Sequence, residues 1–292
     1  MPQNLNAEIR RDENTGTWDV PTKVAAPRRL SWWVTGVVVA IVLFVLLRSV
    51  GRHGHLEWGT VGTYVFDPLI LDGLKTTALL AVAGLAGAIL IGIASGLASV
   101  SKNPVLRGLG LLYVWVFRSV PTLVQILFWG NITLFVTVID VGPPGSSDSL
   151  LAFRFGGIFT PFVTSAVALA VANGAYFSEI VRTGILSVED GYVRAAASLG
   201  LTWWQRQRRV VLPIALRVML PPSGSQFIIV LKETTLVSAI GGGDLLSQAE
   251  GIYSRTFTVI ELLIVVSLWF LLITSCATVL QRWLERRARG SR

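Results

Sequence analysis

The chain has 292 residues, of which 52% are apolar and only 14% are charged, and its mean hydropathy is +0.64. A soluble domain typically carries about 25% charged residues, so much of this protein's surface faces something other than water. The single cysteine, Cys276, cannot form an intramolecular disulfide, and one cysteine excludes cysteine-rich zinc and iron–sulfur sites.

Six long apolar runs predict membrane-spanning helices. A helix needs roughly 20 mostly apolar residues to cross about 30 Å of hydrocarbon. The runs do not alternate between apolar and polar residues, as the strands of a membrane barrel do. We therefore predict an all-α membrane protein with about six transmembrane helices and no soluble module. The runs are Ser31–Val50, Leu69–Val100, Gly108–Val141, Phe159–Ile180, Met219–Ile240 and Val259–Trp283.

The first run does not fit a cleaved signal peptide. Its apolar stretch and the leader before it are both too long, and no small-residue cleavage site follows. We interpret residues 31–50 as a retained anchor helix. Residues 1–30 are polar and mostly without periodicity, which predicts a largely disordered basic tail. Residues 284–292 form a second basic tail.

Basic residues are distributed unevenly along the chain and predict its orientation. If the N-terminus lies inside, 18 of the 25 lysines and arginines fall in inner segments. Because lysine and arginine accumulate on the cytoplasmic side of membrane proteins, we expect both termini to be cytoplasmic. This placement also accounts for the net charge of +8, so we do not interpret that charge as a sign of nucleic-acid binding.

A stripe of small residues follows one face of the second run. Gly84, Ala88, Gly92 and Gly96 recur every four residues. Such a stripe lets another helix approach closely, and helix packing is a better interpretation than a ligand site.

Motifs of several enzyme classes are missing from the sequence. No G-x-x-x-x-G-K-[ST] phosphate loop is present, and the glycine run Gly241–Gly243 lacks the lysine. His53, His55 and Glu57 have a spacing that indicates a metal site only weakly, and a solvated outer loop explains them better. With two histidines in all, the chain carries no visible hydrolase machinery, and we predict that it is not an enzyme.

Three charges lie deep inside otherwise apolar runs: Arg118, Lys232 and Glu233. A charge near the bilayer centre costs at least about 2.5–3.5 kcal/mol, so it normally faces the bundle interior and has a partner there. These groups suit the carboxylate and ammonium of an amino acid. An ion pair of Glu233 with Lys232 or Arg118 that holds helices together is an equally good interpretation, and both can apply.

The connection between the fourth and fifth runs, residues 183–213, is long and patterned. Inner connections between helices usually have about 2–8 residues, whereas this one has about 30. Small residues allow one short helix, and Thr202 is a suitable N-cap for a second. Two short helices at a bend form a knob that can enter a groove on another protein. An amphipathic helix lying on the inner leaflet is the alternative, but the Ala195–Ala197 and Gly200 core is too small to bury much apolar surface in lipid.

This connection resembles the EAA loop of ABC-importer permeases, and other segments resemble the polar-amino-acid branch of that family. The EAA match consists of Ala195-Ala196, Gly200 and Val210-Val211-Leu212-Pro213. Further matching segments are Tyr113 with Arg118–Gln125, Ala175-Tyr176 with Glu179 and Arg182–Ile185, and Pro221-Pro222 with Gln226-Phe227 and Leu231–Leu236. The resemblance covers roughly Gly73–Trp283.

The resemblance implies a type I ABC-importer permease with a five-helix core at residues 69–283, to which residues 31–50 add one helix. It further implies import of a polar amino acid or a similar small polar solute into the cytoplasm of a prokaryote, across the plasma (inner) membrane. The implied partners are a second permease subunit, identical or paralogous, two cytoplasmic ATPase subunits that hold ATP and magnesium, and an extracytoplasmic solute-binding protein. No cofactor is expected on this chain.

The same resemblance assigns roles to individual residues. The candidates for the substrate path are Arg118, Gln125, Lys232, Glu233, Thr234 and Thr235. The candidates for coupling to the ATPase are Arg194, Ala195, Ala196, Gly200, Arg206, Arg208 and Arg209. At Arg194 the family has an acidic residue that helps to dock the loop, so the charge is reversed here.

Two other classes of function remain as alternatives. A secondary transporter or channel would use the intramembrane charges as an ion relay, but no inverted repeat is visible and the patterned inner loop would be unexplained. A scaffold or assembly protein would not need charges within two spans. Co-purification of an ATPase subunit distinguishes the importer from both.

Overall fold

The computed structural model describes residues 10–11, 18–19, 29–53, 56–132, 138–141, 151–154 and 160–289. The chain divides into two compact units, Met1–Leu56 and Glu57–Arg292. In the first unit, the two-residue strands β1 (Arg10–Arg11) and β2 (Trp18–Asp19) pair antiparallel, and α1 (Arg29–His53) covers the first predicted span. Most of the predicted tail 1–30, His55 of the weak metal pattern and the last three residues of the chain lie outside the described residues.

The second unit is a bundle of long helices. Four helical segments are long and apolar enough to cross a membrane, and α4 with α5 gives a fifth crossing if the bent pair forms one span. The elements are α2 (Trp58–Tyr64), α3 (Pro68–Ser99), α4 (Pro104–Ser119), α5 (Thr122–Gly130), β3 (Val138–Val141), β4 (Leu151–Arg154), α6 (Pro161–Leu186), α7 (Asp190–Ser198), α8 (Trp203–Arg206), the π-helix η2 (Gln207–Val211), α9 (Leu212–Glu233), the 3₁₀-helix η3 (Thr234–Ile240), α10 (Leu245–Thr256) and α11 (Val259–Arg289).

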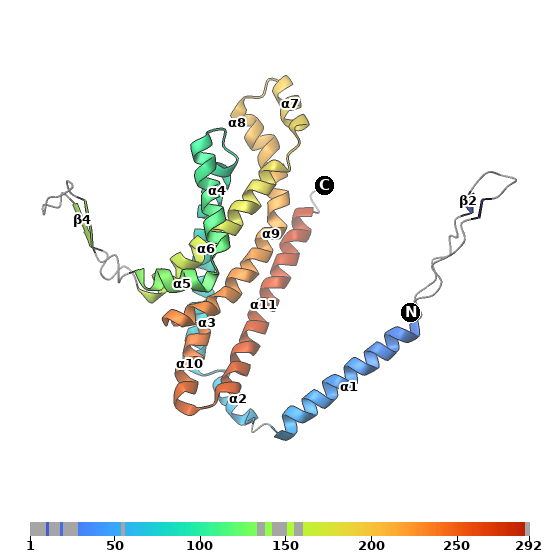
Figure 1. The fold of residues 1–292 in the computed structure, drawn as a ribbon, viewed down its shortest axis with the longest axis vertical. Helices are drawn as coiled ribbons and strands as arrows, with labels where there is room; N and C mark the ends of the chain where they lie inside the picture. The colour runs from blue at the N-terminus through green and yellow to red at the C-terminus, as the bar shows by residue number, and fades with distance from the viewer. Residues whose placement is uncertain are drawn as a thin grey trace. The chain divides into compact units, whose positions relative to one another are not determined.

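Figure 1 shows how this bundle is arranged. Helices α7 and α8 lie at one end, which we call the α7–α8 end, and α2 and α10 lie at the other, the α2–α10 end. Among the long helices of the bundle, α3, α6 and α9 contact one another, and α11 packs against α9. Helix α11 finishes toward the α7–α8 end.

Three helices of the bundle begin with the same local signal, a capping side chain followed by proline. The side chains of Asp67, Asn103 and Thr160 accept hydrogen bonds from the first backbone N–H groups of α3, α4 and α6, and each is followed by a proline. A proline at this position loses no helical hydrogen bond, because the first N–H groups of a helix have no partner within it.

The small-residue stripe of α3 is a packing surface, as its spacing predicts. Gly84, Ala88, Gly92 and Gly96 are all buried, and α6 lies against them. A β-carbon on Gly84 would lie 2.9 Å from Cβ of Leu169, and one on Gly96 would lie 2.8 Å from the backbone oxygen of Ser178. The absence of side chains therefore sets how closely the two helices approach.

The prediction of one continuous third span was wrong. Helix α4 ends at Ser119, and α5 starts at Thr122 with its axis bent by 99°. The physical reason is Pro121, which lacks an N–H group and disfavours helical geometry at Val120. The far end of the predicted span, Val138–Val141, is a strand paired antiparallel with Leu151–Arg154, and residues 133–137 lie outside the described part.

The predicted inner connection is shorter than the sequence suggested, because the flanking helices extend into it. Helix α6 continues to Leu186, and helical structure from Trp203 to Ile240 is continuous. Between α8 and α9 the helix widens into η2, where the N–H of Leu212 donates to the oxygen of Gln207. Pro213 follows directly and cannot donate a helical hydrogen bond, which favours such a local widening.

Candidate functional site

A cavity of about 430 Å³ opens between α4, α6 and α9. Arg118, in the last turn of α4, lines it, and the guanidinium carbon of Arg118 lies 5.3 Å from the centre of the Tyr176 ring. Both residues also line a second cavity of about 320 Å³, on the α4 side. The remaining residues of the larger cavity are Glu179, Ile180, Thr183, Val218, Pro222, Ser225 and Gln226.

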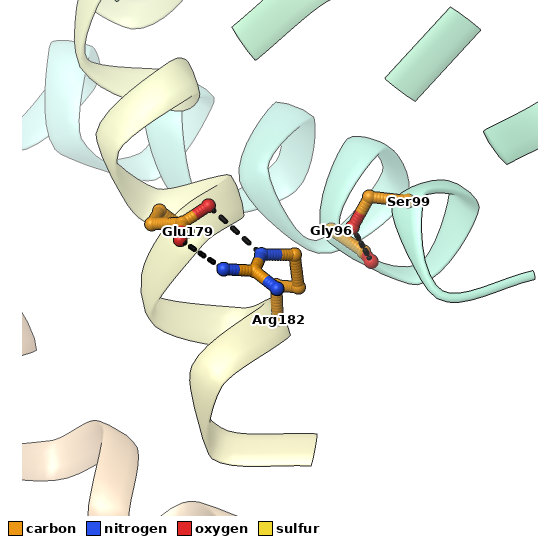
Figure 2. Close-up of polar contacts among 4 residues, drawn as sticks. All are labelled: Gly96, Ser99, Glu179 and Arg182. Atoms are coloured by element: carbon orange, nitrogen blue, oxygen red, sulfur yellow. Dashed lines mark hydrogen bonds and ion pairs between the residues drawn. The ribbon is translucent and has the colours of Figure 1, made fainter. Parts of the chain in front are cut away.

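Glu179 and Arg182 form a two-pronged ion pair on α6, beside the α3 turn in which Ser99 bonds Gly96 (Figure 2). The Nε of Arg182 donates to one carboxylate oxygen of Glu179 at 3.0 Å, and a terminal nitrogen donates to the other at 2.5 Å. About a third of each side chain is exposed. The cavity wall therefore contains a carboxylate and a guanidinium from different elements, Glu179 and Arg118.

Glu233 is the centre of a polar network between helices. Its carboxylate accepts hydrogen bonds from the hydroxyl of Thr122 at 3.2 Å and from the amide nitrogen of Asn173 at 2.8 Å. The amide oxygen of Asn173 accepts from Gln226 at 2.7 Å. We call Thr122, Glu233, Asn173 and Gln226 the central polar network. Because Asn173 lies midway along α6, the network lies in the middle of the bundle.

The alternative of a Glu233 ion pair does not hold within the described residues. Arg118 stacks on Tyr176 instead, Lys232 is exposed, and the hydrogen-bond donors to Glu233 are neutral side chains.

Three of the predicted path residues donate hydrogen bonds to backbone carbonyls and do not line the cavity of about 430 Å³. Gln125 is buried, and its amide donates to the oxygens of Phe117 and Val120 at 2.9 and 2.8 Å, which caps the end of α4 at the bend. The hydroxyls of Thr234 and Thr235 donate to carbonyls three residues earlier. Their side chains therefore stabilise local backbone structure.

Asn173 and Gln226 were missed as site residues. Asn173 is the single amide side chain in the run Phe159–Ile180, and that feature could have identified it. The contacts of Asn173 with α9 join residues 53 and 60 positions apart, which a single sequence does not reveal.

Helices α7 and α8 form a bent knob at one end of the bundle (Figure 1). As predicted, Thr202 caps α8, and Thr202 with Gln205 makes a reciprocal capping box. Gly200 lies at the bend with a φ of 76°, in the left-handed region that favours glycine.

The coupling candidates divide by exposure. Ala196 is buried and Arg206 is half-buried. The exposed candidates are Arg194, Ala195, Gly200, Arg208 and Arg209. Three exposed arginines therefore lie on the knob or directly after it, and the exposed carboxylates of Glu189 and Asp190 lie at the start of α7.

The described residues contain no group of three histidine, cysteine, aspartate or glutamate side chains that could hold a metal ion.

Comparisons with known proteins give a family of membrane transport proteins, in agreement with the bundle of membrane-length helices. Residues 88–290 match the family described as binding-protein-dependent transport system inner membrane component. The chain is 32% identical to the glutamine transport system permease protein GlnP of Escherichia coli, over 80% of this chain and 98% of that protein. It is 31% identical to the arginine transport system permease protein ArgU of Corynebacterium glutamicum, over 87% of this chain and 79% of that protein.

Solved structures of ABC transporters also match this chain. The crystal structure of an amino acid ABC transporter with histidines matches with a TM-score of 0.64 and 32% identity, over 75% of this chain and 94% of that one. The MetNI methionine ABC transporter, in an inward-facing conformation, matches with a TM-score of 0.53 at 17% identity, which supports the fold alone.

Proposed function

The chain belongs to the family of binding-protein-dependent transport system inner membrane components, and we propose that it carries a polar amino acid into the cytoplasm. It is a multi-pass permease subunit of an ABC importer, and as a transport component it is not itself an enzyme. Family membership implies an ATPase and a solute-binding protein as partners. It also excludes the alternative of a secondary transporter or channel.

One observation carries the proposed substrate class: Arg118 and Glu179 line the same cavity of about 430 Å³. An α-amino acid presents a carboxylate and an ammonium group, which these side chains complement. Arg182, which does not line the cavity, also bonds Glu179, so two guanidinium groups and one carboxylate lie in and beside the cavity. Charge-assisted hydrogen bonds from a guanidinium to a carboxylate are among the strongest in proteins. We therefore assign the substrate carboxylate to Arg118.

The other path candidates have different roles in this proposal. Glu233 is connected to the cavity through Asn173 and Gln226, so it remains in the path. Lys232 is exposed on the bundle and is available to a neighbouring subunit. Gln125, Thr234 and Thr235 bond backbone carbonyls, and we assign them to the architecture of the path rather than to the solute.

The α7–α8 knob is the proposed contact with the ATPase. Arg194, Arg208 and Arg209 are exposed around it and suit an acidic rim on the partner's groove. The knob then lies in the cytoplasm with both chain termini, and the α2–α10 end receives the solute-binding protein. A second permease, identical or paralogous, and two ATPase subunits that bind ATP and magnesium complete the proposed assembly.

Reconstitution tests the function. The permease, its ATPase and its binding protein are placed in proteoliposomes with ATP, and uptake of each of a panel of radiolabelled amino acids is measured. We expect ATP-dependent uptake of one or a few polar amino acids, and a strong loss with Glu179→Gln at unchanged co-purification of the ATPase. Uptake of none of the panel by the wild-type complex would contradict the substrate class.

A further inference from the structure

Two helices of the bundle change their geometry at the same place. Helix α4 gives way to α5 at Pro121, and α9 gives way to the 3₁₀-helix η3 after Glu233. The hydroxyl of Thr122, in the first turn of α5, donates to Glu233, the last residue of α9. One side-chain hydrogen bond therefore joins the break between α4 and α5 to the point where α9 continues as a 3₁₀-helix.

Beyond these points, α5 and η3 pack against each other; α5 also packs against α6, and η3 against α3 and α6. We call the pair the α5–η3 block. Ile126 of α5 and Val237 of η3 are fully buried in an apolar cluster that they share with residues of α3 and α6, namely Leu80, Ala168 and Leu169. A β-carbon on Gly130 would lie 2.5 Å from a side-chain carbon of Ile240, so the two helices touch closely there. Protein interiors repack between discrete arrangements rather than deform continuously, so α5 and η3 shift together when the cluster that they share with α3 and α6 repacks.

The remaining members of the central polar network connect this block to the cavity. Gln226 lines the cavity and donates to Asn173, which in turn donates to Glu233. Gln226 and Asn173 are both buried. The Glu233 carboxylate is half-buried, and its donors Thr122 and Asn173 help to hold it in place, because hydrogen bonds to charged groups contribute more than those between neutral groups. A change at Gln226 therefore alters how firmly Glu233 holds Thr122.

We propose that Glu233 is a positioning residue that links occupation of the cavity to movement of the α5–η3 block. The inference rests on the proposed function, since it takes the cavity as the solute site. A solute that hydrogen-bonds Gln226 weakens the bond of Gln226 to Asn173. Asn173 and Glu233 then rearrange, and the Thr122–Glu233 bond releases the block.

Thr122→Val tests this inference, because valine has a similar shape but no hydroxyl. The measurement is ATP hydrolysis by the full complex in proteoliposomes, with and without the loaded binding protein. Hydrogen bonds to charged groups contribute about 1.5–3 kcal/mol, and about 1.4 kcal/mol is tenfold in an equilibrium. We expect the stimulated-to-basal ratio to fall about tenfold as basal hydrolysis rises. Thr122→Ser, which keeps the hydroxyl, restores the wild-type ratio.

Thr278→Val is the matched control, because the hydroxyl of Thr278 bonds only its own helix, at Thr274. A purely structural role for Thr122 would lower the yield of complex but leave the ratio unchanged. If Thr122→Val does not assemble, Glu233→Gln gives the same comparison. A ratio equal to that of the control, for whichever variant assembles, overturns the inference.

The two proposals fail in different measurements. Basal ATP hydrolysis is measured without solute. The change in the basal rate therefore tests the role of Glu233 even if the wild-type complex imports no amino acid. A wild type that imports amino acids, with Thr122→Val indistinguishable from the control, overturns the inference alone. The double variant Thr122→Val with Gln226→Leu adds a check: if both residues act through Glu233, their effects on the ratio are not additive.

Discussion

The guanidinium of Arg118 stacks over the ring of Tyr176, with 5.3 Å between the guanidinium carbon and the ring centre. Both residues line the larger cavity and the smaller one beside it. The stacked pair therefore lies where the two cavities adjoin. A cation held on an aromatic face keeps its hydrogen-bond donors free for an anionic group.

Arg118→Ala should weaken uptake without preventing assembly. It removes the cation assigned to the substrate carboxylate, and loss of one charge-assisted contact of about 1.4 kcal/mol raises the KM for uptake about tenfold. Arg107→Ala is the control, because Arg107 is exposed near the start of the same helix. Initial rates of uptake at varied solute concentration provide the measurement. A wild-type KM for Arg118→Ala would remove Arg118 from the site.

The orientation of the bundle can be tested at its two ends. After Cys276 is replaced by serine, a single cysteine is introduced at Leu199 in the α7–α8 knob or at Gly251 in α10, both exposed positions. The distribution of basic residues predicts that an impermeant thiol reagent labels position 251 from outside intact cells and position 199 only after lysis. A cysteine at Pro2 tests the N-terminus and should behave like position 199. Labelling of position 199 in intact cells would invert the proposed topology.

Asp244 makes the folding stability of the protein depend on pH, through its place at the α2–α10 end. Its side chain caps α10 and accepts from the N–H of Leu246 and the hydroxyl of Ser247, yet burial raises the pKa of this carboxyl above its ordinary value of 3.8. The folded state thus binds the proton more tightly than the unfolded state. Protonated Asp244 therefore stabilises the folded state. This stabilisation is fully present below the ordinary pKa of 3.8 and is lost as the pH rises through the raised pKa of the folded state.

Asp244→Asn should remove this dependence, because asparagine caps helices about as well but does not ionise. Melting temperatures of the purified complex between pH 4 and pH 8 are compared, and the wild type should lose stability relative to the variant as pH rises. Asp244→Ala, which removes the cap, should cost about 1 kcal/mol even at low pH. Parallel curves for wild type and Asp244→Asn would contradict the effect of burial.

Much of the fold follows from local signals in the sequence. Apolar runs of membrane length place α3, α6 and α11, and the glycine stripe of α3 identifies its packing face. The bend at Pro121 was not anticipated, because apolar residues continue on both sides of it, although a proline inside a helical run is itself a signal for a break.

The site was less predictable than the fold. A single sequence indicates that Arg118 and Glu233 are costly in a membrane, and it therefore suggests that they face the interior. It does not indicate that Arg118 stacks on Tyr176 or that Glu233 bonds Asn173, because these partners lie 58 and 60 residues away along the chain. Such contacts depend on how α4, α6 and α9 pack.

Arg194→Glu should weaken docking of the ATPase, although it introduces the acidic residue that the resemblance to the EAA loop implies at this position. The Nε of Arg194 bonds the oxygen of Asp190 within α7, and the side chain is exposed. Its terminal nitrogens bond no other described residue, so they are free to bond a partner. We expect co-purification of the ATPase to fall several-fold, with Arg194→Gln intermediate. Stronger docking of Arg194→Glu would show that the partner groove retains a basic residue.

Gly200→Leu should uncouple the complex, but not by crowding within this chain, which is what a bulky residue at a bend first suggests. A β-carbon at Gly200 meets nothing within 4 Å, whereas the φ of 76° is unfavourable for any residue with a side chain. The left-handed conformation costs a non-glycine residue roughly 1–2 kcal/mol, and asparagine tolerates it better than leucine. The expected order of substrate-stimulated ATP hydrolysis, from highest to lowest, is therefore wild type, Gly200→Asn, and then Gly200→Ala and Gly200→Leu.

Gly191→Ala is the control, because Gly191 lies inside α7 with open space around it and alanine favours helix there. Equal hydrolysis by Gly200→Leu and the control would show that the bend does not transmit the ATPase's movement. If alanine behaves like the wild type and only leucine fails, the effect comes from contact with the partner groove, and backbone strain is not the cause.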